Sequence, residues 1–78
     1  MAAIESMADD YALTARKQEV ALHLARGHTF PETDEALGVS LDTVRTHVKC
    51  LYRKTGVHKK GHFIALIEER RPDREALG

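Results

Sequence analysis

The sequence lacks tryptophan and has one cysteine, two prolines, two tyrosines and two phenylalanines among its 78 residues. A single cysteine excludes an internal disulfide framework, which fits a reducing interior such as the cytoplasm. Because aromatic residues are so few, the core must be built from Leu, Val, Ile and Ala. The scarcity of β-branched runs, glycine and proline favours helix over sheet. The composition therefore predicts an all-α fold.

Long apolar runs are also missing. No run approaches the length that a membrane-spanning helix needs, and the N-terminus has no basic region followed by an apolar stretch, so we expect no signal peptide. The chain is long enough for one domain. A core of this size is marginal, so we expect stability to depend on well-capped helices or on a second copy of the chain.

The elements of common catalytic sites are absent from the sequence. No nucleophile stands beside an obvious base, and there is neither a glycine-rich phosphate loop nor a His-Glu-x-x-His pair. A chain of this length cannot enclose a deep substrate cleft. We therefore expect no enzymatic activity and no cofactor.

A metal site is the main chemical alternative. His47 and Cys50 are three residues apart, and His58 and His62 are four apart, and both spacings suit ligands on a helix. Neither pair has a Cys-x-x-Cys anchor, so a basic surface is the better interpretation of these residues. A zinc titration distinguishes the two interpretations.

The formal net charge is zero, but the charges are unevenly distributed. No acidic residue occurs from Thr43 to His62. Such a distribution fits either a solvated surface or a phosphate-binding face. The cationic residues of this segment are Arg45, Lys49, Arg53, Lys54, Lys59 and Lys60.

Apolar spacing and capping residues predict four helices within residues 13–70. Residues 1–12 contain small and acidic residues without a sustained period, so we expect a flexible arm, and residues 71–78 are expected to be a tail. The predicted helices run from Thr14 to Arg26, from about Phe30 to Leu37, from Leu41 to about Lys54, and from about Lys60 to Arg70.

The second and third predicted helices are joined by Gly38-Val39-Ser40. Gly38 permits the positive φ of a sharp turn. Val39 is apolar and can fill the angle between the helices together with Leu37 and Val44. This spacing predicts a helix-turn-helix unit, whose second helix projects from the domain and fits the major groove of DNA.

Polar residues on the third predicted helix suit DNA. Arg45, Thr46 and Lys49 share one face, from which Arg and Lys can bind guanine and Thr can contact a base edge. The start of the helix and the basic residues beyond it suit backbone phosphates. The predicted phosphate-contacting residues are Ser40, Thr43, Arg53, Lys54, Lys59 and Lys60.

Several short motifs resemble the LuxR-type, or GerE-like, helix-turn-helix domain. They cover about Leu13 to Leu66. The matching pieces are Leu13-Thr14 with Arg16, Glu19-Val20, Leu24-Ala25, Gly27, Thr29, Glu32, Leu37-Gly38-Val39-Ser40, Thr43-Val44-Arg45 with His47, and Lys54-Thr55-Gly56-Val57.

The resemblance implies a bacterial transcription regulator that binds double-stranded DNA, with the positions of Arg45, Thr46 and Lys49 facing base edges. It also implies a homodimer on DNA, and RNA polymerase is a further expected partner. Phe63, Ile64 and Ile67 in the last helix are candidates for the dimer contact, although an apolar stripe on a helix also suits packing within one chain.

Several positions depart from the family pattern, among them Ala21, His23, Lys60 and Phe63. Two more lie in the second predicted helix. Thr33 and Asp34 stand where the family usually has Ile-Ala, close to the neighbouring helix. A carboxylate at Asp34 must reach solvent or find a partner such as Arg16 or His47.

A protein-interaction role is the runner-up function. Such a module pairs with a larger regulator through its last helix and does not read DNA itself, which suits the zero net charge and Asp34. Because Met1 opens the chain, a stand-alone regulator is favoured over the output end of a longer protein.

Overall fold

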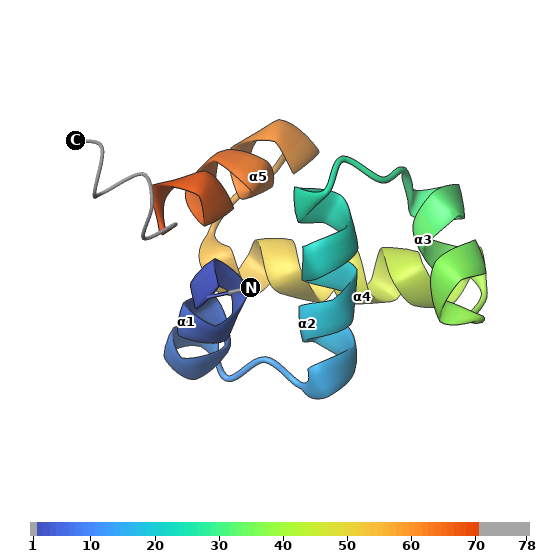
Figure 1. Cartoon of the computed structure of the whole chain (residues 1–78), viewed down its shortest axis with the longest axis horizontal. Helices are drawn as coiled ribbons and strands as arrows, with labels where there is room; N and C mark the ends of the chain where they lie inside the picture. The colour runs from blue at the N-terminus through green and yellow to red at the C-terminus, as the bar shows by residue number, and fades with distance from the viewer. Residues whose placement is uncertain (1, 71–78) are drawn as a thin grey trace.

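The computed structural model describes residues 2–70, which form five helices and no strand (Figure 1). The all-α class is confirmed. Within these residues every helix is too short or too polar to cross a membrane. The tail predicted for residues 71–78 lies outside the described part. The helices are α1 (Ala2–Tyr11), α2 (Ala15–Ala25), α3 (Phe30–Leu37), α4 (Leu41–Thr55) and α5 (Lys60–Glu69).

Side-chain caps determine where three of the helices begin. Thr14, Thr29 and Ser40 each accept a hydrogen bond from the backbone N–H three residues later. At α3 the bond is reciprocal, because Glu32 Oε1 accepts from the Thr29 N–H at 2.8 Å. Each such cap stabilises a helix by about 1 kcal/mol. The four helices expected from the sequence are therefore present, with ends within one or two residues of the predicted bounds.

The N-terminal segment differs from the prediction of a flexible arm. Residues 2–11 form α1, and its Ala3, Ile4 and Met7 are buried. These residues lie on one side of a helix, and burying them against α2 and α5 compensates the loss of chain entropy. The polar residues between these three buried residues made the helical spacing difficult to recognise in the sequence. The domain therefore has five helices in its described residues, one more than expected.

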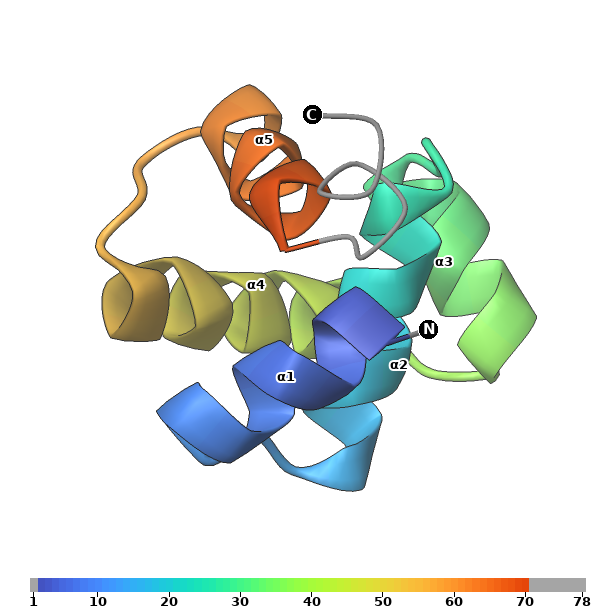
Figure 2. The same ribbon diagram turned by 60° about the vertical axis from the view of Figure 1, so that its left-hand side comes forward.

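The core lies where α2 crosses α4 and where α5 and α1 close over them (Figures 1 and 2). Val20 and Leu24 from α2 meet Val44 and Leu51 from α4, and all four side chains are fully buried. Full burial of such side chains stabilises the fold by about 1.5–3 kcal/mol each. The remaining buried apolar residues are Ala3, Ile4, Met7, Leu13, Ala21, Val48, Phe63 and Ile67.

A tight turn joins α3 to α4. Gly38 has φ +68° and ψ 31°, the left-handed conformation that the sequence predicted for this glycine. Leu37 and Val39 are partly buried and pack against the core cluster, to which Val44 belongs. This packing agrees with the predicted apolar filling between the two helices.

The two unusual positions in α3 are accommodated differently. Thr33 is fully buried, and its Oγ1 donates to the carbonyl oxygen of Thr29 at 2.9 Å. Asp34 is partly buried. Among residues 2–70 no ion pair joins its carboxylate to Arg16 or His47, and Arg16 pairs with Glu19 at 3.0 Å instead.

Candidate nucleic-acid interface

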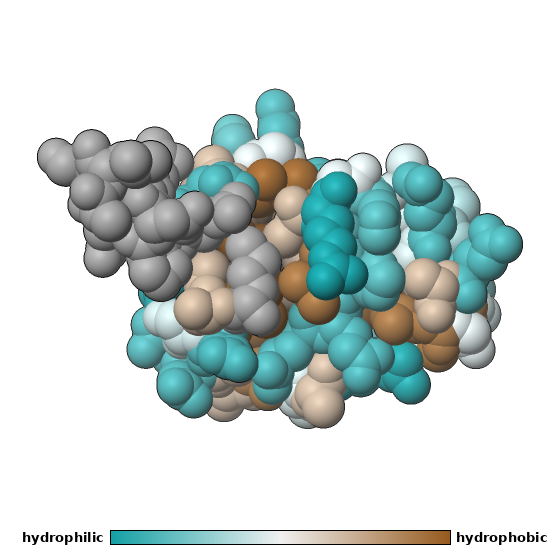
Figure 3. Space-filling model, viewed as in Figure 1, coloured by the Kyte–Doolittle hydropathy of each residue, from teal (hydrophilic) through white to brown (hydrophobic). Residues whose placement is uncertain are grey.

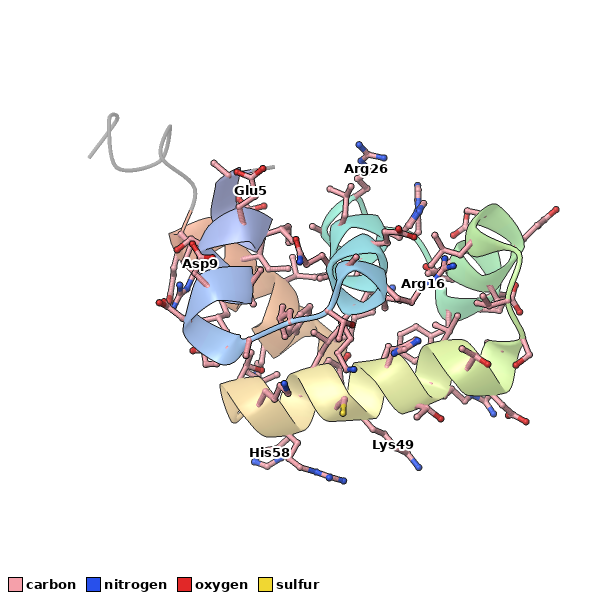
Figure 4. All side chains as sticks on the ribbon, turned by 90° about the horizontal axis from the view of Figure 1, so that it is seen from below. Glu5, Asp9, Arg16, Arg26, Lys49 and His58 are labelled. Carbon is pink, nitrogen blue, oxygen red and sulfur yellow. The ribbon has the colours of Figure 1, made fainter. Side chains whose placement is uncertain are left out.

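One face of α4 is exposed along its whole length and carries no acidic residue after its first turn. Arg45, Thr46, Lys49 and Arg53 are all exposed on it. The opposite face holds the buried Val44, Val48 and Leu51. In Figure 4, Lys49 projects from α4 away from α1 and α2. We call Arg45, Thr46, Lys49 and Arg53 the basic face.

Hydroxyl groups at the start of α4 are engaged within the helix. Ser40 Oγ accepts from the Thr43 N–H at 3.1 Å and lies 2.8 Å from Thr43 Oγ1. Thr46 Oγ1 donates to the carbonyl oxygen of Asp42 at 2.9 Å. Ser40 is exposed and Thr43 is partly buried. These bonds hold the first turns of α4 in a fixed shape, which suits a surface that must match a rigid groove.

Two of the predicted phosphate-contacting lysines bind backbone carbonyls of their own chain. Lys54 Nζ donates to Tyr11 O at 3.2 Å and Ala12 O at 3.3 Å, at the end of α1. Lys60 Nζ donates to His28 O at 2.7 Å and lies 5.7 Å from the centre of the Phe30 ring. Both ammonium groups therefore hold neighbouring elements together. Lys54 remains exposed, whereas Lys60 is partly buried.

Exposed basic residues also follow the end of α4, next to the basic face. Lys59 and His58 are exposed in the connection to α5. A shallow hollow beside them combines cations with apolar carbon. Such a surface suits a phosphodiester backbone, which presents charged oxygens and sugar carbons together. The hollow is lined by Lys49, Tyr52, Arg53, Gly56, Val57 and His58.

Cations from α2 also approach α4, which sequence spacing did not indicate. His47 is partly buried, and its pKa is lowered below the ordinary 6.5 first by burial and then by the charges of Lys17 and Arg16. These two residues are therefore near α4 although they are far from it in sequence. Cationic groups near α4 thus include residues of α2, although Arg16 is paired with Glu19.

The three dimer candidates are not equivalent. Phe63 and Ile67 are 0 % exposed and belong to the core of the single chain. This burial fits the alternative of packing within one chain, because the face of α5 that carries them packs against the rest of the domain, and a contact with a second copy stays a prediction. Ile64 is partly buried and remains available.

The residues considered for a metal site are spread over the surface. His47 and Cys50 are partly buried in α4, whereas His58 and His62 are exposed in the connection and in α5. Within residues 2–70 no three His, Cys, Asp or Glu side chains are grouped so as to hold a metal ion.

Known proteins resemble this chain over the same region. Residues 11–67 match the GerE family, described as bacterial regulatory proteins of the luxR family. The chain is 40% identical over 55 residues to the probable transcriptional regulatory protein SgaR of Hyphomicrobium methylovorum. The aligned region covers 70% of this chain and 26% of SgaR.

Two further relatives are named as regulators. The probable transcriptional regulatory protein NarL of Mycobacterium tuberculosis is 40% identical over 53 residues, which is 68% of this chain and 24% of NarL. The HTH-type transcriptional activator RamA of Corynebacterium glutamicum is 35% identical over 48 residues, which is 62% of this chain and 17% of RamA. The chain thus matches about a quarter or less of the length of these relatives. No solved structure is significantly similar to it.

Proposed function

Because the chain belongs to the luxR family of bacterial regulatory proteins, we propose that it binds double-stranded DNA sequence-specifically and regulates transcription, with α4 in the major groove. The observation that carries the proposal is the basic face, which is exposed, has no acidic side chain after the first turn of α4, and lies on a helix whose other side holds the buried Val44, Val48 and Leu51. Such a helix presents its side chains to a groove without rearrangement of the core. The proposal includes no catalytic reaction.

The residues of the basic face take different roles in this proposal. Arg45 and Lys49 bind guanine edges, where an arginine can make two hydrogen bonds to one base, and Thr46 contacts a neighbouring base. Arg53 and Lys59 bind phosphates beyond the base-reading residues, and Ser40 and Thr43 do so at the start of α4. Lys54 and Lys60 contribute long-range positive potential while they hold α1 and the α2–α3 connection.

Further partners follow from the same proposal. A second copy of the chain binds through the remaining accessible part of α5, around Ile64, so that two copies of α4 meet successive half-sites. The face seen in Figure 3 shows hydrophobic colour in separate small areas, one of them over α5, which suits a limited contact. RNA polymerase is the further partner of a regulator bound at a promoter.

The proposal is tested by DNA binding of matched variants. DNA fragments recovered from the source genome with the purified chain serve as probes, and affinity is measured across a salt series. Arg45→Ala and Lys49→Ala should each weaken binding by about 1–3 kcal/mol and relax the preference at one base pair. Arg26→Ala is the control, because Arg26 is also an exposed arginine but projects away from α4 (Figure 4).

The salt series separates this function from the alternative. Binding should weaken steeply as salt rises, because phosphate contacts release counterions. Unchanged affinity in both α4 variants would remove the basic face as the reading surface. Failure to recover any DNA would instead favour a module that pairs with a larger regulator through α5.

A further inference from the structure

Two histidines face each other where α2 ends and α3 begins. His23 lies in the last turn of α2, and His28 lies in the connection to α3. Their Nδ1 atoms are 2.9 Å apart, their ring centres are 5.1 Å apart, and both side chains are partly buried. A hydrogen bond between these atoms needs one Nδ1–H donor and one Nδ1 lone pair. The arrangement therefore accepts two neutral rings or one charged ring, but not two charged rings.

The pair is connected to three helices. His23 belongs to α2, and Thr29, the residue after His28, caps α3. The carbonyl oxygen of His28 accepts a hydrogen bond from Lys60 Nζ of α5 at 2.7 Å. The position of His28 is thus fixed through its ring to α2 and through its backbone to α5. Any force that separates the two rings acts on the segment that positions α3.

The charged groups around the pair offset a second proton only in part: Glu19 raises the pKa of His23, but the lowering effects outweigh it. Arg26, the C-cap of α2, and Glu19 within α2 act on His23, and Glu32 of α3 and Lys60 of α5 lie near His28. The carboxylate of Glu32 is already used in the α3 capping box, and that of Glu19 is paired with Arg16. Burial, then the neighbouring His28 and Arg26, lower the pKa of His23 below its ordinary 6.5.

We propose that His23 and His28 form an acid-sensitive clasp, which holds the α2–α3 connection closed while at most one of the two imidazoles is protonated. When both rings are protonated, neither Nδ1 can accept, and two like charges face each other at hydrogen-bond distance. The rings then separate, and the connection loosens together with the start of α3.

The sign of the pH dependence follows from the lowered pKa of His23. The unfolded chain takes up this proton near its ordinary pKa of 6.5, before the folded chain does. The contribution of the clasp to stability is therefore complete above that pH and is lost as pH falls through the folded value. A lower affinity for DNA in acid is a further consequence, which rests on the proposed function; the clasp itself is tested without DNA.

The first test follows both imidazoles of the full chain by NMR during a pH titration. The clasp predicts that His23 and His28 titrate as a coupled pair, with the second proton bound below pH 6.5. Independent titration of His23 and His28 in single steps would overturn the clasp. This measurement needs no variant, so it decides the matter even where a substitution fails to fold.

The second test compares urea unfolding at pH 7.5 and pH 5.5. When the pH is lowered from 7.5 to 5.5, the folding equilibrium constant should fall in both the native chain and His28→Leu. The fall should be about threefold or more larger in the native chain, because His28→Leu has no second imidazole to charge. His62→Gln, which alters an exposed histidine, should lose as much stability as the native chain. Equal losses in His28→Leu and the native chain would contradict the clasp.

Discussion

Among residues 2–70, the Tyr52 hydroxyl is the one buried side-chain nitrogen or oxygen without a hydrogen-bond partner. The Tyr52 ring packs against Phe63, with ring centres 5.6 Å apart. Burial raises the pKa of this phenol above its ordinary 10.0. The hydroxyl therefore costs free energy in the folded state without a compensating bond.

Tyr52→Phe should accordingly leave the free energy of unfolding unchanged or raise it by up to about 1 kcal/mol. Chemical denaturation at neutral pH measures this change. Tyr11→Phe is the matched control and should be destabilising, because it removes the hydroxyl that shares a hydrogen bond with Arg70 while it keeps the ring contact with the guanidinium. A loss of more than about 1 kcal/mol in Tyr52→Phe would show that the hydroxyl has a partner.

The lysines show how far the sequence alone identifies the residues of the candidate nucleic-acid interface. The acid-free segment from Thr43 to His62 indicated a basic surface, and Arg45, Lys49 and Arg53 are indeed exposed on one face of α4. Lys54 and Lys60 could not be distinguished from them by spacing, because their carbonyl acceptors are 42 or 43 and 32 residues away in sequence. Which cations bind carbonyl oxygens of their own chain and which remain exposed on α4 therefore depends on the tertiary fold.

The capping box of α3 makes a testable contribution at the scale of the element. The backbone N–H of Thr29, and then its side chain, lower the pKa of Glu32 below its ordinary 4.5. Because the folded carboxylate holds its charge more strongly than the unfolded one, this contribution is present above pH 4.5 and is lost as pH falls through the folded value.

Glu32→Gln should therefore show a smaller loss of stability on acidification than the native chain. Thermal unfolding at pH 7 and at pH 3.5 measures the difference. Glu35→Gln, on the exposed side of the same helix and outside the capping box, should keep the pH dependence of the native chain. Identical pH dependence of the native chain and Glu32→Gln would count against the box as a source of acid sensitivity.

Helix α1 provides a second prediction at this scale. Met7 is 0 % exposed, so Met7→Ala should lower the free energy of unfolding by about 2–5 kcal/mol, as large-to-small changes in a core do. Glu5→Ala on the exposed side of α1 is the control and should change it little. The two values are read from denaturation curves, and an equal, small effect of both substitutions would show that α1 does not belong to the core.

The helices differ in how well the sequence defined them. Thr14, Thr29 and Ser40 cap α2, α3 and α4 by local hydrogen bonds, so their starts could be predicted from residue type and spacing. Helix α1 could not, because its buried Ala3, Ile4 and Met7 are few, and their burial depends on packing against α2 and against α5, which is distant in sequence. The same long-range packing turned Phe63 and Ile67 inward.

At the scale of the whole molecule, the zero net charge conceals a separation of charges. Lys49 and His58 project from one side of the domain in Figure 4, whereas Glu5 and Asp9 lie on α1 at another. A field of this kind orients the basic face towards a polyanion although the total charge is zero. The distribution of the charges over the surface, rather than their sum, is therefore the relevant quantity for binding a polyanion.

The most direct test of the central claim is to map where duplex DNA touches the chain. Backbone amide NMR signals of the native protein are followed while a selected genomic duplex is added at low salt. The largest changes should fall on Arg45, Thr46, Lys49 and Arg53 of the exposed face of α4, with little change at Glu5 and Asp9. Changes confined to α1 or α5, with α4 unaffected, would contradict the assignment of α4 as the DNA-reading helix.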